Sequence, residues 1–159
     1  MSEDEKNFDH WFKKTLKFLY KKPGAGFAIL MISLPLLERY LRQKTGLYDK
    51  SLSPKFYRAL EDLFPALRIP RFPKAAEGFW TIYRDGLLHQ AALTLRWKKT
   101  QLGVKNDLAV EIQCHEVKSG LSIMVSPELF ARKVVSTIKA DFSTYLGQGS
   151  KHHPLPKVH

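Results

Sequence analysis

One short segment of the chain combines side chains of the types that cleave phosphodiester bonds. Arg84, Asp85 and His89 provide a permanent cation, a carboxylate and an imidazole within two helical turns. Cleavage of RNA without a metal requires a base for the ribose 2′-hydroxyl, an acid for the leaving 5′-oxygen and positive charge beside the phosphorane. We therefore expect His89 to act as acid and base, Arg84 to bind the phosphate and Asp85 to orient the imidazole.

The spacing of these residues decides what one copy of the chain can assemble. Asp85 and His89 are four residues apart, so on a regular helix they share a face and the carboxylate can fix the imidazole tautomer. Arg84 lies about 140° around such a helix from His89, so its reach or a helix end near Gly86 must close the gap. One imidazole cannot be base and acid at once, which predicts a homodimer whose two motifs face each other.

A structural role is the alternative for these charged residues. Arg84 and Asp85 would then form an ion pair on a helix surface, and His89 would cap the helix. Glu38, late in an apolar helix, is a candidate for crossing to Arg84 and orienting it, but pairing with Arg42 at the i,i+4 spacing is the simpler account.

A basic stretch follows the motif and suits contacts with RNA. Between Gly86 and Asn106 the chain has no Asp or Glu. The lysine and arginine side chains in this stretch would contact phosphates, and the indole of Trp97 would stack on a base. The same residues are equally compatible with a solvated face of a β-hairpin. The RNA-binding residues predicted on this basis are Arg96, Trp97, Lys98 and Lys99.

Helices must position most of these residues. Apolar residues recur at three- and four-residue steps, and Pro23 and Gly24 interrupt the first such pattern to form a helical hairpin. Pro35 either kinks the second helix or restarts it after Ser33. A proline-containing linker over residues 65–73 precedes the helix that carries the motif. The predicted helices span residues 8–22, 27–44, 54–64 and 75–92.

The hydrophobic period changes after the motif. Alternating residues at 93–97, 108–114 and 123–125, with Gly103 and Gly120 between them, predict a small antiparallel β unit within about residues 93–125. A last helix runs from Pro127 to Gly147, and residues 148–159 form a polar, flexible tail. The predicted fold is mainly α, with one domain over residues 1–147.

The composition limits the classes of partner, metal site and cellular location. The net charge of +11 favours an anionic partner such as RNA, a membrane surface or an acidic protein. Cys114 is the lone cysteine, so neither an intramolecular disulfide nor a cysteine-rich zinc site can form, and we assign no metal ion and no cofactor. Residues 1–7 do not resemble a secretory signal, and the apolar run at 27–37 is shorter than the roughly 20 residues of a membrane span. We expect a cytoplasmic protein.

The motif resembles that of a known superfamily. Residues 83–90, Tyr-Arg-Asp-Gly-Leu-Leu-His-Gln, are similar to the Arg-polar-x-x-x-His motif of the HEPN superfamily of helical nucleases. The resemblance implies a bundle of four or five helices, homodimerisation and metal-independent RNase activity in toxin–antitoxin, antiviral-defence or RNA-processing systems. It also implies a site formed by Arg84, Asp85 and His89. The β unit is not part of the minimal bundle of that family.

These observations favour one function over two others. The first is an endoribonuclease that acts by 2′-hydroxyl attack and leaves 2′,3′-cyclic phosphates, with an acidic antitoxin or a nucleotidyltransferase as a partner. The second is a non-enzymatic helical module that binds RNA or a protein. The third is a peripheral membrane protein that uses the helix from Trp11 to Lys22, which explains that helix but not the motif.

Overall fold

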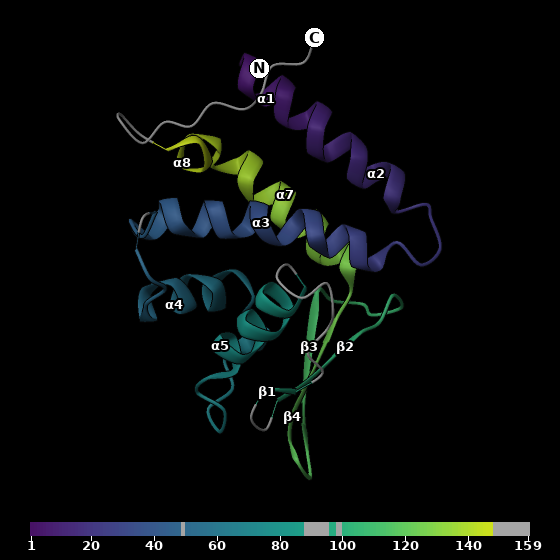
Figure 1. Ribbon diagram of the computed structural model, residues 1–159, viewed down its shortest axis with the longest axis vertical. Coiled ribbons are helices and arrows are strands. Elements are labelled where there is room, and N and C mark those ends of the chain that lie inside the picture. Colours follow the sequence, from purple (N-terminus) through teal and green to yellow (C-terminus); the bar gives the residue numbers. More distant parts are fainter. Residues whose placement is uncertain (49, 88–95, 98–99, 148–159) are drawn as a thin grey trace.

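The computed structural model describes residues 1–48, 50–87, 96–97 and 100–147. Helix α3 (Gly26–Thr45) lies at the centre (Figure 1). The N-terminal helices and the C-terminal helices lie on one side of it, and α4 and α5 lie on the other, next to a small sheet. The prediction of a mainly α fold with a small β unit is confirmed.

The N-terminal helical segment begins five residues earlier than predicted. It consists of α1 (Glu3–Phe8), the π-helical turn η1 (Asp9–Lys14) and α2 (Thr15–Leu19). The Ser2 hydroxyl accepts a hydrogen bond from the backbone N–H of Glu5, whose carboxylate accepts one from the Ser2 N–H. This reciprocal capping box satisfies backbone donors at the helix start, so the acidic residues 3–5 form the first helical turn.

Helix α3 continues through Pro35 and does not restart there. The proline removes the N–H that would bond to the carbonyl of Met31, but both residues are exposed, so water can satisfy that carbonyl. The helix ends at Gly46, whose φ of +69° is the left-handed conformation that favours glycine. One unbroken helix therefore carries both the first apolar half and Glu38.

Aromatic contacts hold the helices on the two sides of α3. The ring of Phe8 lies 5.4 Å from that of Tyr145 in α8 (Phe142–Leu146), centroid to centroid. On the other side, Phe56 of α4 (Pro54–Leu63) lies 4.8 Å from Trp80. Burial of such rings stabilises the fold and fixes where each helix lies.

The linker and the motif helix follow α4. The proline-containing linker includes the 3-10 turn η2 (Pro65–Leu67). Helix α5 (Ala75–Trp80) then continues into a π-helical turn, η3 (Thr81–Gly86). The helix predicted over residues 75–92 is thus present as far as Leu87, and its last five residues lie outside the described part of the chain.

The sheet is mixed, so the prediction of an antiparallel unit is wrong for one strand pair. Its strands are ordered β1-β2-β4-β3, and β2 pairs with β4 in parallel while the other pairs are antiparallel. Parallel neighbours need a crossover, and here β3 supplies it by lying on the far side of β4. The strands are β1 (Arg96–Trp97), β2 (Thr100–Val104), β3 (Ile112–Val117) and β4 (Gly120–Val125).

Two further boundaries differ from the prediction. Residues 108–111 precede the strand rather than belong to it, because β3 begins at Ile112. The predicted last helix is divided into α7 (Pro127–Ala140) and α8 at Asp141, whose φ of −138° is not helical. The carboxylate of Asp141 accepts a hydrogen bond of 3.1 Å from the Tyr40 hydroxyl, which ties this break to α3.

Candidate active site

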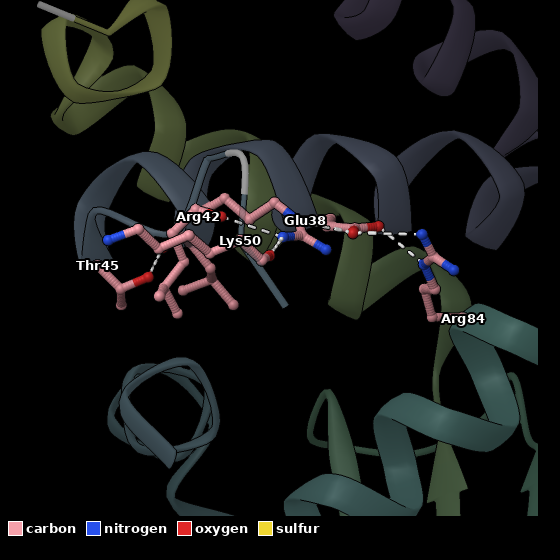
Figure 2. Close-up of polar contacts among 7 residues, drawn as sticks. Glu38, Arg42, Thr45, Lys50 and Arg84 are labelled. Carbon is pink, nitrogen blue, oxygen red and sulfur yellow. Dashed lines mark hydrogen bonds and ion pairs between the residues drawn. The ribbon is translucent and has the colours of Figure 1, made fainter. Parts of the chain in front are cut away.

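Arg84 and Glu38 form an ion pair between η3 and α3 (Figure 2). The Nε of Arg84 donates to Oε2 of Glu38 at 2.8 Å, and its Nη2 donates to Oε1 at 3.3 Å. The two side chains are only 23% and 13% exposed. The crossing of Glu38 to Arg84, which the sequence made the less simple of two accounts, is therefore present as a contact.

The local pair with Arg42, which the sequence favoured as the simpler account, is also present. The Nε of Arg42 donates to Oε1 of Glu38 at 2.8 Å. The Nη1 of Arg42 donates to the carbonyls of Leu47 and Lys50, so this guanidinium also holds the segment after α3 (Figure 2). From the sequence, Arg84 and Arg42 are alternative partners of Glu38, whereas in the structure its two carboxylate oxygens accept hydrogen bonds from both.

The charge of Glu38 is stabilised by these guanidinium groups. Burial by itself would raise the pKa of the carboxyl, but hydrogen bonds from Arg84 and Arg42 outweigh it and lower the pKa below the ordinary value. Glu38 is therefore ionised at neutral pH. Together, Glu38, Arg84 and Arg42 carry a net charge of +1.

The motif begins on a π-helical turn rather than on a regular α-helix. Arg84 and Asp85 both belong to η3, which ends at Gly86. The angle of about 140° calculated for an α-helix therefore does not apply to this stretch. Single π-helical turns are rare in proteins, and those that occur are often found at functional sites. The structure describes the backbone of Asp85 within η3 but not its side chain.

Tyr83 connects this turn to the sheet. Its ring is fully buried, 5.0 Å from that of Phe79, and its hydroxyl donates to the carbonyl of Gly103 in β2. Burial raises the pKa of Tyr83, so the hydroxyl keeps its proton and remains a donor. A Cβ at Gly103 would lie 2.7 Å from the sulfur of Met124, so a larger residue here would require the end of the methionine side chain to move.

The structure places the other predicted site residues only in part. Arg96 and Trp97 form β1, whose backbone contacts η3, but their side chains are not described. His89, Lys98 and Lys99 lie outside the described residues. The structure thus brings together Arg84 and Glu38, and the convergence of Arg84 with His89 stays a prediction.

Neither metal ligands nor membrane spans are found in the part of the chain that the structure describes. Within that part, no three His, Cys, Asp or Glu side chains are grouped so as to hold a metal ion. No helix there is long and apolar enough to cross a membrane. The comparisons give no relative, because no family model, no curated protein and no solved structure matches the chain.

Proposed function

We propose that the chain is a HEPN-like, metal-independent endoribonuclease with Arg84, Asp85 and His89 as its site and Glu38 as a positioning residue. The observation that supports it is the fixed guanidinium of Arg84, which donates two hydrogen bonds to Glu38 of another helix and is thereby held in a half-buried position. A phosphate-binding arginine gains from such fixation, because its planar donors must match the phosphate oxygens.

The proposed reaction needs no water in its cleavage step. One His89 removes the proton of the ribose 2′-hydroxyl, and the 2′-oxygen attacks the adjacent phosphorus. The bond between phosphorus and the 5′-oxygen breaks, and a second, protonated His89 gives its proton to that oxygen. Arg84 stabilises the negative charge that develops on the phosphorane. The products are a 2′,3′-cyclic phosphate and a free 5′-hydroxyl.

The second His89 would come from a second copy of the chain. Phe27, Met31 and Pro35 form an exposed apolar stripe on α3 at four-residue steps. On a helical projection Glu38 falls within the same arc of about 80°, so the stripe leads to the ion pair with Arg84. Phe27 and Met31 are 38% and 39% exposed, and a copy that covers them would bring its own motif nearby.

Cleavage by matched variants tests this function. Purified wild type, His89→Ala and Arg84→Ala are incubated with a mixed-sequence RNA in EDTA, and melting curves verify that each is folded. Arg42→Ala is the matched control, because it also removes a guanidinium from Glu38 but lies outside the motif. We expect wild type and Arg42→Ala to leave cyclic phosphate ends, and each motif variant to lose about 100-fold or more in rate.

The opposite result supports a different function. The ion pair of Arg84 with Glu38 also suits a non-enzymatic RNA- or protein-binding module in which it only joins η3 to α3. If folded His89→Ala cleaves as well as wild type, or if none of the proteins cleaves, this module replaces the nuclease.

A further inference from the structure

A basic groove lies between the N-terminal helical segment and α7. It is a hollow of about 500 Å³. One wall carries lysines of η1 and α2, and the other carries cations of α7, while no carboxylate lines it. The charged residues that line this α2–α7 groove are Lys13, Lys17, Arg132 and Lys139.

The groove carries more positive charge than its neighbours neutralise. Asp9 accepts two hydrogen bonds of 2.9 Å from Lys139 and lies 3.6 Å from Lys13. Glu128 lies 2.7 Å from a guanidinium nitrogen of Arg132. Glu5 also interacts electrostatically with Lys139. Three carboxylates thus face the four cations that line the groove, which leaves an excess of one positive charge.

Lys17 carries the clearest part of this excess. Among the described residues no ion pair of Lys17 is formed, and its side chain lines the groove. A fold gains nothing from gathering unneutralised cations, because their mutual repulsion opposes compaction. An anionic ligand in the groove would remove that repulsion.

The groove is separate from the candidate active site. Figure 1 places α2 and α7 on one side of α3, and α5, which leads into η3, on the other. Glu38 and Arg84 therefore do not line the groove, and neither is among its residues. Its charge needs an explanation of its own.

Exposed aromatic rings next to these lysines narrow the class of ligand. Phe18 is 60% exposed, and Trp11, on the same helical segment, is 44% exposed. The Nζ of Lys22 lies 4.8 Å from the centroid of the Phe18 ring and covers one of its faces, so a base would stack on the other face. Phe18 follows Lys17 directly, so it lies about 100° around the helix from the groove wall. Single-stranded nucleic acids bind to such surfaces, because cations follow the backbone while aromatic faces stack on the bases.

We propose that the α2–α7 groove binds the phosphodiester backbone of single-stranded RNA, with Phe18 as a stacking platform for a base. That RNA is the nucleic acid rests on the proposed function, whereas the excess charge of the groove does not. A membrane surface fits less well, because the cations line two walls of a concavity that a flat lipid surface cannot enter. A polyanionic strand can lie between the walls and contact both.

Binding to an RNA that cannot be cleaved tests the groove independently of catalysis. The full chain is titrated into a fluorescent, fully 2′-O-methylated single strand at several salt concentrations. The groove variant is Lys17→Gln/Arg132→Gln, and the control is Lys55→Gln/Lys118→Gln, which removes the same charge at exposed positions on α4 and in the β3–β4 turn. Melting curves verify that both are folded, and Lys17→Gln alone serves if the loss of Arg132 impairs folding.

The expected result is a change in both affinity and salt dependence. We expect the groove variant to bind about tenfold or more weakly and its salt slope to fall by about 1.4, because each lost phosphate contact on a single strand removes roughly 0.7. Phe18→Ala should weaken binding severalfold. Equal binding by groove and control variants would overturn the proposal, as would binding to phosphatidylserine vesicles but not to RNA.

Failure of the groove and failure of the nuclease are distinguishable. If the groove variant binds weakly but wild type does not cleave RNA, the groove stands and the nuclease falls. If wild type cleaves and the groove variant binds the methylated strand as well as the control does, the nuclease stands and the groove falls.

Discussion

The ion pairs on the two sides of α3 differ in how the protein balances their charge. Near Arg84, one carboxylate holds two guanidinium groups, and the three side chains are 13% to 23% exposed. In the α2–α7 groove the cations are more open, with Arg132 55% exposed and Lys13 36% exposed. Half-buried cations need a partner within the protein, whereas water can solvate exposed ones. The ionised Glu38 is therefore required by the fold, and the charge excess of the groove is not.

A π-helical turn carries charged residues in both regions. Asp9 of η1 contacts Lys139, which is 130 residues away, and Arg84 of η3 contacts Glu38, which is 46 residues away. In each case a charged residue of a short, irregular turn joins a helix that is distant in the sequence. The two turns differ in that η3 is locked by the buried Tyr83, whereas no residue of η1 is buried.

Removal of the carboxylate from each region should give the largest contrast. Glu38→Ala leaves Arg84 and Arg42 half-buried without their shared acceptor, so we expect the free energy of unfolding to fall by about 2–3 kcal/mol. Glu128→Ala removes the exposed partner of Arg132 and should cost less than about 1 kcal/mol. Urea denaturation measures both. Similar losses in the two variants would contradict the distinction between a buried and a solvated cluster.

The same carboxylate predicts a stability change in acid. The pKa of Glu38 is lowered in the folded protein, so the unfolded chain takes up its proton first as the pH falls. The stabilisation by ionised Glu38 is complete above the pKa of this carboxyl in the unfolded chain, about 4.5. It is lost as the pH falls through the lower pKa of Glu38 in the folded protein. The difference in unfolding free energy between wild type and Glu38→Gln should be constant from pH 7 to about 5.5 and shrink below about 4.5. A difference that stays constant down to pH 3 would refute this assignment.

Local patterns were sufficient to predict the helices. Apolar periodicity and the break at Pro23 and Gly24 predicted the helical hairpin, and α3 and α4 follow the predicted ranges closely. The earlier start of the first helix needed the reciprocal bonds of Ser2 and Glu5, a local signal that the sequence also contains. Helix boundaries depend on such caps more than on periodicity.

The errors in the sheet and the missed groove concern contacts between distant segments. Strand β2 was missed because Gly103 was interpreted as a turn residue, whereas its lack of a side chain makes room for Met124. The parallel pairing of β2 with β4 depends on the whole path of β3, which no local pattern encodes. The contact of Glu38 with Arg84 was only the less simple alternative to its pairing with Arg42. The groove was missed because its walls are far apart in the sequence.

Replacement of each arginine by lysine separates geometry from charge. Arg84 donates to both oxygens of Glu38, and a lysine keeps the charge but not this pair of bonds. We expect Arg84→Lys to lower the unfolding free energy by about 1 kcal/mol and Arg132→Lys by less than about 0.5 kcal/mol, because the latter pair is exposed. Urea denaturation of both variants measures this, and equal effects would show that only the charge of Arg84 matters to the fold.

The smallest predicted effect is a change in stability that has opposite signs for two lysines of the groove. Lys139 is paired with Asp9, whose hydrogen bonds raise the pKa of the lysine, so Lys139→Gln should destabilise the protein by up to about 1 kcal/mol. Lys17→Gln should change stability by less than about 0.5 kcal/mol, in the stabilising direction at low salt, because it removes a repelling charge. Thermal melts at low and high salt test this, since the gain should vanish when salt screens the repulsion. Destabilisation by Lys17→Gln would mean that this lysine already has a partner that the fold needs, and its charge would then be unavailable to a phosphate. Opposite signs for the two lysines would instead locate the excess charge at Lys17, where the proposed RNA strand has to neutralise it.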